Sequence, residues 1–203
     1  GQILAIGFPA SITNFMQSLG IALTNRFLLP YGNERVAAMG IVMKVNMIAV
    51  LILVGFAFGG QPLIGYNYGA GNRKRLKEIL SFAYRFECGG ALLLALVLSF
   101  AARPMIELFM KDSVIVDAGI PMLRMQLAGM PFVAVILITT CVFQSAGKAW
   151  NAFLLSVSRQ GVLFAVVLFL ASSLAGYCGV LAAQAVSDLL TALLAVWLFM
   201  KKE

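Results

Sequence analysis

The sequence contains no histidine, and only 11% of its 203 residues are charged. The lack of histidine excludes His-dependent catalytic dyads and most transition-metal sites. A soluble domain carries about 25% charged residues, so this composition cannot supply a water-exposed surface. The sequence also has no phosphate-binding loop and no dinucleotide-binding glycine pattern. We therefore expect neither an enzyme nor a bound cofactor.

Cysteine and targeting signals are scarce as well. The three cysteines, Cys88, Cys141 and Cys178, are far apart and odd in number, which suits neither a disulfide framework nor a metal site. The first residues show no basic region followed by a short apolar stretch and a cleavage site, so no signal peptide is expected. Because Gly1 leads directly into apolar sequence, we expect the chain to be the later part of a longer protein.

Hydrophobic residues dominate what is present, at 62% of the chain. The net charge is +7, but the cations gather at the ends of apolar segments and form no continuous basic face. Nucleic acid is therefore not an expected partner. The expected surroundings of most side chains are instead the hydrocarbon tails of a lipid bilayer.

Six apolar segments are long enough to cross a bilayer, which takes about 20 residues of helix. Alternation of polar and apolar residues is missing, so helices are favoured over barrel strands. We predict an all-α membrane protein that forms one six-helix lobe over residues 1–203. The predicted spans are about residues 3–29, 36–60, 80–102, 120–143, 152–171 and 180–200. The connection between the third and fourth spans is long enough for a short interfacial helix.

The loop cations predict the orientation, because Lys and Arg are enriched in cytoplasmic loops. Seven lie on one side of the predicted topology and three on the other. The larger set is Arg73, Lys74, Arg75, Lys77, Lys148, Lys201 and Lys202, and the smaller set is Arg35, Arg103 and Lys111. The larger set predicts a cytoplasmic side that also holds both termini.

Ionisable residues inside spans are costly and are candidates for function. Asp188 lies deep in the sixth span, with Gln184 one turn earlier on the same helix face. Lys44 lies at a similar depth in the second span, so a pair between Lys44 and Asp188 is predicted. The alternative is that Lys44 reaches outward to the interface and that a protonated Asp188 is held by Gln184. Arg159 lies about two turns into the fifth span and is either functional or extended toward the interface. Arg85, Glu87 and Arg124 are expected at the membrane interfaces.

Uncharged polar residues gather in the first span. Asn14, Gln17 and Ser18 fall on one helix face, and Thr24 and Asn25 follow further along. This stripe is expected either to line a hydrated cleft or to bond to a neighbouring helix. Three prolines, Pro9, Pro121 and Pro131, permit bends within or beside the first and fourth spans.

The stretch "GGQPLIGYNYGAGNRKR", with "IGFPA", "YGNERVAAMGI" and "VFQSAGKAWNAFLLSVSRQG", resembles the bacterial branch of the multidrug and toxic compound extrusion (MATE) family. The resemblance is to the second half of that family. It implies twelve helices in two lobes around a central cleft, of which this chain is the C-terminal lobe and the N-terminal lobe is absent. It also implies export of cationic, amphipathic compounds in exchange for H⁺ or Na⁺, in a bacterial plasma membrane.

The resemblance also assigns expected roles to residues. Family members often carry an acidic coupling residue in the first helix of a lobe, where this chain has neutral Gln17, Thr24 and Asn25. The coupling carboxylate is therefore expected in the other lobe, with Asp188 as a second candidate. A hinge and packing role is expected for the collar that follows the second span, namely Gln61, Pro62, Tyr66, Asn67, Tyr68 and Gly69. Two other functions stay open: a lipid-linked oligosaccharide flippase of the same superfamily, and a membrane subunit that does not transport.

Overall fold

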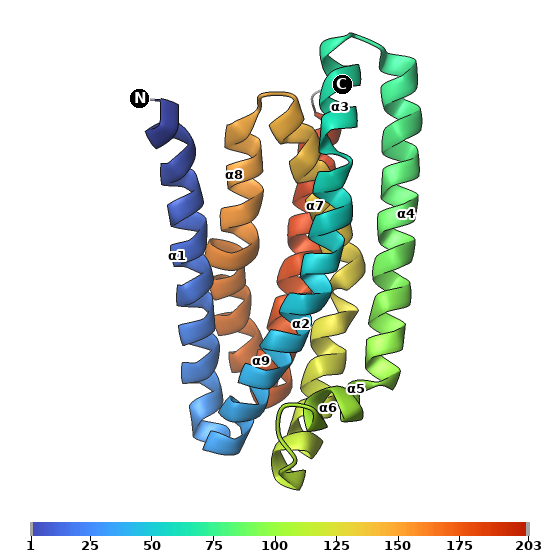
Figure 1. The fold of residues 1–203 in the computed structure, drawn as a ribbon. Coiled ribbons are helices and arrows are strands. Elements are labelled where there is room, and N and C mark those ends of the chain that lie inside the picture. Colours follow the sequence, from blue (N-terminus) through green and yellow to red (C-terminus); the bar gives the residue numbers. More distant parts are fainter. Residues whose placement is uncertain (1, 202–203) are drawn as a thin grey trace.

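The computed structural model describes the backbone of residues 2–201 and the side chains of residues 11–201, and all regular structure in this part of the chain is helical. Figure 1 shows the arrangement of the helices. In chain order the elements are α1 (Gln2–Leu28), η1 (Leu29–Tyr31), α2 (Asn33–Gly59), α3 (Gln61–Gly69), α4 (Arg73–Phe100), α5 (Ala102–Glu107), α6 (Ser113–Ala128), α7 (Met130–Ser145), α8 (Ala149–Val157), the π-helical segment η2 (Ser158–Val162) and α9 (Leu163–Met200). The predicted all-α fold is confirmed.

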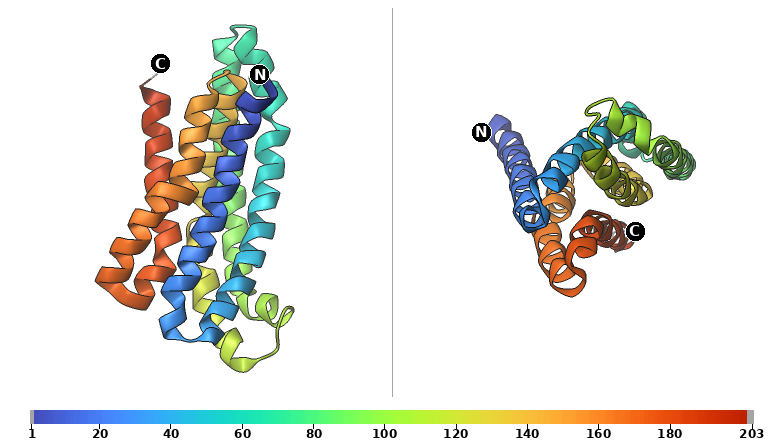
Figure 2. Two further views of the ribbon diagram at one scale, coloured as in Figure 1. Left: turned by 90° about the vertical axis from the view of Figure 1, so that its left-hand side faces the viewer. Right: turned by 90° about the horizontal axis from the view of Figure 1, so that it is seen from below.

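These elements build six helical rods that run side by side along the long axis of the molecule (Figures 1 and 2). In chain order the rods are α1; α2 with α3; α4; α6 with α7; α8 with η2 and the part of α9 before Gly176; and the rest of α9. The stretches Asn33–Gly69, Arg73–Phe100 and Ala149–Met200 are each long and apolar enough to cross a membrane, and α6 with α7 forms a fourth if the bent pair counts as one span. The third stretch contains two rods, because Gly176 has non-helical backbone angles and divides α9. The predicted limits of the six spans within a bilayer stay a prediction.

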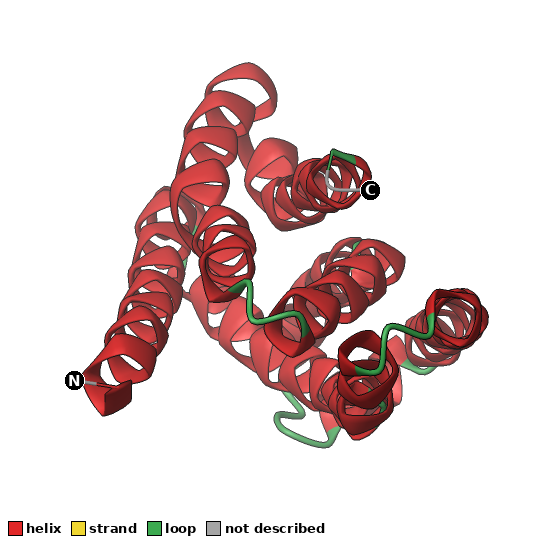
Figure 3. Cartoon of the chain, turned by 90° about the horizontal axis from the view of Figure 1, so that it is seen from above, coloured by secondary structure: helices red, strands yellow, loops and turns green. Residues whose placement is uncertain are grey.

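The connections lie at two opposite ends of the bundle. The α3–α4 turn, the α7–α8 turn and both ends of the chain lie at one end, whereas η1, α5 and the bend of α9 lie at the other (Figures 1 and 2). Most of the connections are short, as the view from above shows (Figure 3). The two sets of loop cations therefore lie at opposite ends of the lobe, apart from Lys202, which is outside the described residues.

The second rod is longer than the sequence pattern predicts. The pattern predicts an end near residue 60, but the helix resumes as α3 and continues to Gly69. Gly60 keeps near-helical angles (φ −81°, ψ −12°), and Pro62 lies in the first turn of α3, where its missing N–H costs no hydrogen bond. The tight turn comes later, at Gly71, whose φ of +66° favours glycine.

The fourth rod is broken beside Pro131, one of the three prolines that permit a bend, whereas Pro121 lies inside the unbroken helix α6. Its halves α6 and α7 are bent by 41° at Gly129, and Pro131 lies in the first turn of α7. The rod also begins earlier than predicted, because Asp112 caps α6 by accepting hydrogen bonds from the amides of Val114 (2.9 Å) and Ile115 (3.3 Å). The expected short helix before it is α5.

The fifth and sixth rods form a hairpin with almost no loop. The sequence predicts a connection around residues 172–179, but the chain reverses at Gly176, with φ +54° and ψ −126°. Gly179 lies so close to the carbonyl of Ala171 that a Cβ atom there would collide with backbone. Glycine at both positions therefore permits the sharp reversal.

The core of the bundle lies along α2, α6 and α7. Met39, Val42, Leu123, Leu127 and Met130 are all fully buried. Most of α7 is buried, and this helix packs against α2, α3, α4, α8 and α9. A helix that is apolar on every face belongs at the centre of a bundle, and α7 takes that position.

Two tyrosine rings and an arginine form a cluster at the end of the bundle that holds η1. The ring centroids of Tyr31 and Tyr177 are 5.3 Å apart, and Cζ of Arg35 lies 4.3 Å from the centroid of the Tyr177 ring. The cluster connects the α1–α2 corner to the hairpin of α9, so these two connections are held together by aromatic and cation–π contacts.

Candidate functional site

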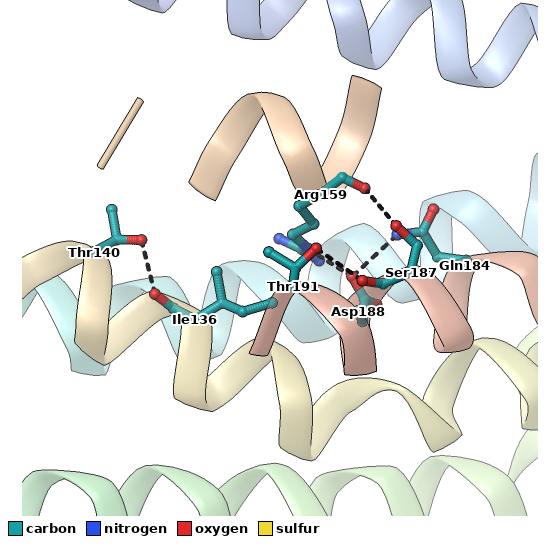
Figure 4. Close-up of polar contacts among 7 residues, drawn as sticks. All are labelled: Ile136, Thr140, Arg159, Gln184, Ser187, Asp188 and Thr191. Carbon is teal, nitrogen blue, oxygen red and sulfur yellow. Dashed lines mark hydrogen bonds and ion pairs between the residues drawn. The ribbon is translucent and has the colours of Figure 1, made fainter. Parts of the chain in front are cut away.

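A buried carboxylate lies near the middle of the sixth rod. Asp188 is 2% exposed, and its Oδ1 accepts hydrogen bonds from Nε of Arg159 (2.8 Å) and from Nε2 of Gln184 (3.2 Å), as Figure 4 shows. The guanidinium side chain is 14% exposed, so both charges of the pair are largely removed from solvent. A buried ion pair is tolerated when each charge is balanced and hydrogen-bonded, and both conditions hold here.

Arg159 reaches the carboxylate from a π-helical segment. In η2 the backbone is wound more widely than in an α-helix, and such segments are often found at functional sites. Ser187 binds this segment to the sixth rod by donating a hydrogen bond from its Oγ to the backbone oxygen of Arg159 at 3.2 Å. The sixth rod therefore holds the π-helical segment at two points, through a side-chain ion pair and a backbone contact (Figure 4).

Two glycines let the first rod approach the π-helical segment closely. A Cβ atom on Gly161 would lie 3.0 Å from Sδ of Met16, and a Cβ atom on Gly20 would lie 3.2 Å from the backbone oxygen of Gln160. Both distances are shorter than ordinary van der Waals contacts. The absence of a side chain at these positions thus permits the packing of α1 on η2.

The break in the fourth rod lies against the other side of the carboxylate. A Cβ atom on Gly129 would lie 3.0 Å from Oδ2 of Asp188 and 3.3 Å from Cα of Ala185. Asp188 therefore occupies the point where the α6–α7 break, the π-helical segment and the sixth rod meet. Each of the first two is an irregularity at which a helix can change direction.

A family model described as MatE matches residues 9–170, which is more than half of the chain. The chain belongs to the MatE family. The multidrug export protein MepA of Staphylococcus aureus (strain N315) is 28% identical over 196 residues, which cover 96% of this chain and 43% of the relative. MepA of Staphylococcus haemolyticus (strain JCSC1435) is 28% identical over 202 residues, covering 97% and 43%.

Solved MATE transporters have the same fold over this length. The MATE transporter ClbM, solved in complex with Rb⁺, matches with a TM-score of 0.84 at 25% identity and covers 96% of this chain and 46% of its own. The Vibrio cholerae MATE transporter VcmN, in its bent form, matches with a TM-score of 0.87 at 21% identity, covering 98% and 45%. The chain spans less than half the length of the curated relatives it matches. The predicted fold of one MATE-type lobe is confirmed.

Within this MATE-type lobe, the predicted ion pair between Lys44 and Asp188 is wrong. Arg159 is the partner of Asp188, and the ion pairs found among the described residues do not include Lys44, which is exposed. The prediction was wrong because depth in the membrane was counted from the predicted limits of each span. The fifth rod begins at Ala149 and continues to Gly176, so Arg159 lies further from the helix ends than the predicted span implied. The predicted contact between Gln184 and Asp188 is present.

The polar stripe of the first span divides into two parts. Asn14, Gln17 and Ser18 are exposed, and Asn25 is half-buried. Thr24 differs, because it is 3% exposed and its Oγ1 donates to the backbone oxygen of Gly20 at 2.9 Å. Most of the stripe thus points away from its own bundle, whereas Thr24 belongs to the interior.

The collar of the MATE-type lobe is tied to the end of α7. Nε2 of Gln61 donates to Oε1 of Gln144 at 3.1 Å, and Ser145 Oγ donates to the backbone oxygen of Gln61 at 3.4 Å. Asn67 is buried and donates to the backbone oxygen of Leu63 at 2.9 Å. The collar also contains Pro62, Tyr66, Tyr68 and Gly69, all of which are exposed. Its hinge role stays a prediction.

Sequence reasoning missed three residues of the interior. Glu87 was expected at the interface but is 3% exposed. Ser187 and Gly129 were not singled out, although they complete the surroundings of Asp188. The serine lies next to a deep carboxylate in "VSDLL", which is the signal that could have identified it. Contacts of Glu87 and Gly129 depend on packing between rods, and the sequence pattern carries no such signal.

We predict that Arg159 and Asp188 are energetically coupled. Arg159→Met and Asp188→Asn should each lower the free energy of unfolding by about 3–5 kcal/mol, because each leaves one buried charge without its partner. The double variant should lose less than the sum of the two. Thermal unfolding in detergent measures all four proteins of this cycle.

Lys44→Met supplies the matched control for this cycle. Combined with Asp188→Asn, it should be additive to within about 0.5 kcal/mol, because Lys44 is exposed and is not paired with Asp188. Additivity of Arg159→Met with Asp188→Asn, or strong coupling of Lys44 to Asp188, would contradict the geometry.

Proposed function

We propose that this chain is the C-terminal lobe of a secondary multidrug transporter that exports cationic, amphipathic compounds in exchange for H⁺ or Na⁺. The observation that carries the proposal is the match of nearly the whole chain to one half of MATE transporters, including multidrug export proteins named MepA. The structure of ClbM in complex with Rb⁺ adds a relative that holds a monovalent cation. The proposed surroundings are the bacterial plasma membrane, with both termini in the cytoplasm.

Transport by this mechanism requires a second lobe. In alternating access, two bundles rock against each other around a shared site, and one bundle has no opposing wall. The exposed residues Asn14, Gln17 and Ser18 support this proposal, because they form a polar surface directed away from the lobe's own core. We assign this surface to the wall of the cleft between the lobes.

The ion pair indicates what this lobe contributes to coupling. Asp188 is already neutralised by Arg159, so it would have to leave the guanidinium before it could take up H⁺ or Na⁺. We therefore assign the main coupling carboxylate to the other lobe. In this lobe, Asp188 and Arg159 hold the α6–α7 break against the π-helical segment while the lobe moves as a body.

The proposal predicts that the chain alone does not transport. Proteoliposomes that contain only this chain should show no drug-dependent flux under an H⁺ or a Na⁺ gradient, because one lobe cannot enclose a site that opens to both sides. Proteoliposomes that also contain the complementary lobe should show flux driven by one of the two gradients. Flux from a monomer of the chain alone would contradict the one-lobe mechanism, and absence of flux from the assembled pair would contradict transport.

A cysteine at position 17 tests the assignment of the cleft wall. In the assembled pair of lobes, Gln17→Cys should react with a water-soluble maleimide, and a transported cation should slow that reaction. Leu19→Cys is the control, since it lies two residues away on a different helix face. Both belong in a Cys178→Ser background, because Cys178 is exposed. Labelling of position 17 no faster than position 19 would contradict a hydrated cleft.

A further inference from the structure

A second buried carboxylate lies in α4, outside the site at Asp188. Glu87 is 3% exposed, and its Oε1 has no hydrogen-bond partner among the described residues. A buried acceptor without a partner costs free energy, so its presence requires an explanation. The residue is also not among the ion pairs found in the described part of the chain.

Glu87 is one of the residues that line a groove between the second and third rods. The groove has a volume of about 270 Å³, with Ile52, Leu53 and Phe56 from α2 and Phe86 and Leu93 from α4 among its walls. Every other described side chain that lines it is apolar. The groove therefore combines apolar walls with a single acidic residue.

Both α2 and α4 contribute an aromatic ring to the groove. The ring centroids of Phe56 and Phe86 are 5.5 Å apart in an edge-on arrangement, and those of Phe82 and Phe86 are 5.7 Å apart and stacked. Exposed aromatic faces attract organic cations through cation–π contacts. Ile52, Phe56, Phe86 and Leu93 are all between 45% and 64% exposed, so the groove opens on an apolar outer surface.

We propose that this groove binds an aromatic organic monocation, with Glu87 as the counter-charge and Phe56 and Phe86 as the aromatic walls. Charge complementarity selects this class of ligand, because a cation is what an unpartnered carboxylate lacks and apolar walls disfavour a hydrated metal ion. The apolar opening gives access from the bilayer, where lipophilic cations gather. The inference rests on the proposed function only for the class of compound, and it places a binding site outside the cleft between the lobes.

Binding of benzyltrimethylammonium to the purified chain tests the site. Equilibrium dialysis in detergent gives its Kd, and Glu87→Gln should raise that Kd by at least about tenfold, because it removes the charge and keeps the shape. Phe86→Leu should raise it severalfold through the loss of one aromatic face. Glu78→Gln is the matched control in the same helix, because Glu78 is exposed and already paired with Arg75 at 3.1 Å, and it should leave the Kd unchanged.

A neutral isostere of benzyltrimethylammonium tests the site on the wild-type chain, so the test does not depend on whether a variant folds. Neopentylbenzene has carbon in place of the ammonium nitrogen, so the wild-type chain should bind it at least about tenfold more weakly than the cation. Equal binding of the two compounds, or an unchanged Kd for the cation in folded Glu87→Gln, would overturn the site. The assay needs neither a second lobe nor an ion gradient. Cation binding without transport would thus support the site and contradict only the proposed function. Transport without Glu87-dependent binding would contradict only the site.

Discussion

The arrangement of the fourth, fifth and sixth rods depends on one ion pair, between the buried carboxylate of Asp188 and Arg159. Asp188 lies among apolar rods, where an unpaired charge costs several kcal/mol, and the Arg159 guanidinium at 2.8 Å balances it. That contact requires the fifth rod to present Arg159 inward, which it does from the π-helical segment. It also requires space beside the carboxylate, which Gly129 provides at the break of the fourth rod. Three features that appear separate in the sequence are therefore one arrangement.

Among the described residues, the two buried carboxylates differ in whether they have hydrogen-bond partners. Asp188 accepts hydrogen bonds from a guanidinium and an amide, and such a paired group suits a fixed structural joint. Glu87 has an oxygen without a partner among the described residues, beside an apolar groove. An incompletely bonded group suits a site that is completed by a ligand. The same residue chemistry thus serves internal cohesion in one rod and recognition in another.

The sequence predicted the helical rods and offered the contact between Gln184 and Asp188, because composition and helix periodicity act locally. It permitted a bend at any of three prolines, without indicating that the bend lies beside Pro131. It did not predict the partner of Asp188, since depth was counted from span limits that differ from the helix ends. Burial of Glu87 arises from packing between helices, which no local pattern encodes. Thr24 shows the same limit: its polar side chain is satisfied within its own helix and turned inward.

The central claim is that Asp188 holds the π-helical segment in place, and amide hydrogen exchange tests it most directly. In Asp188→Asn, the amides of residues 158–162 should exchange about a hundredfold faster than in the wild type, which corresponds to a loss of about 3 kcal/mol of local stability. The α4 amides that exchange by local opening should keep their rates, because that helix packs mainly on α7, α3, α6 and α2. Unchanged exchange at residues 158–162, or an equal increase in the locally exchanging amides of α4, would contradict the claim.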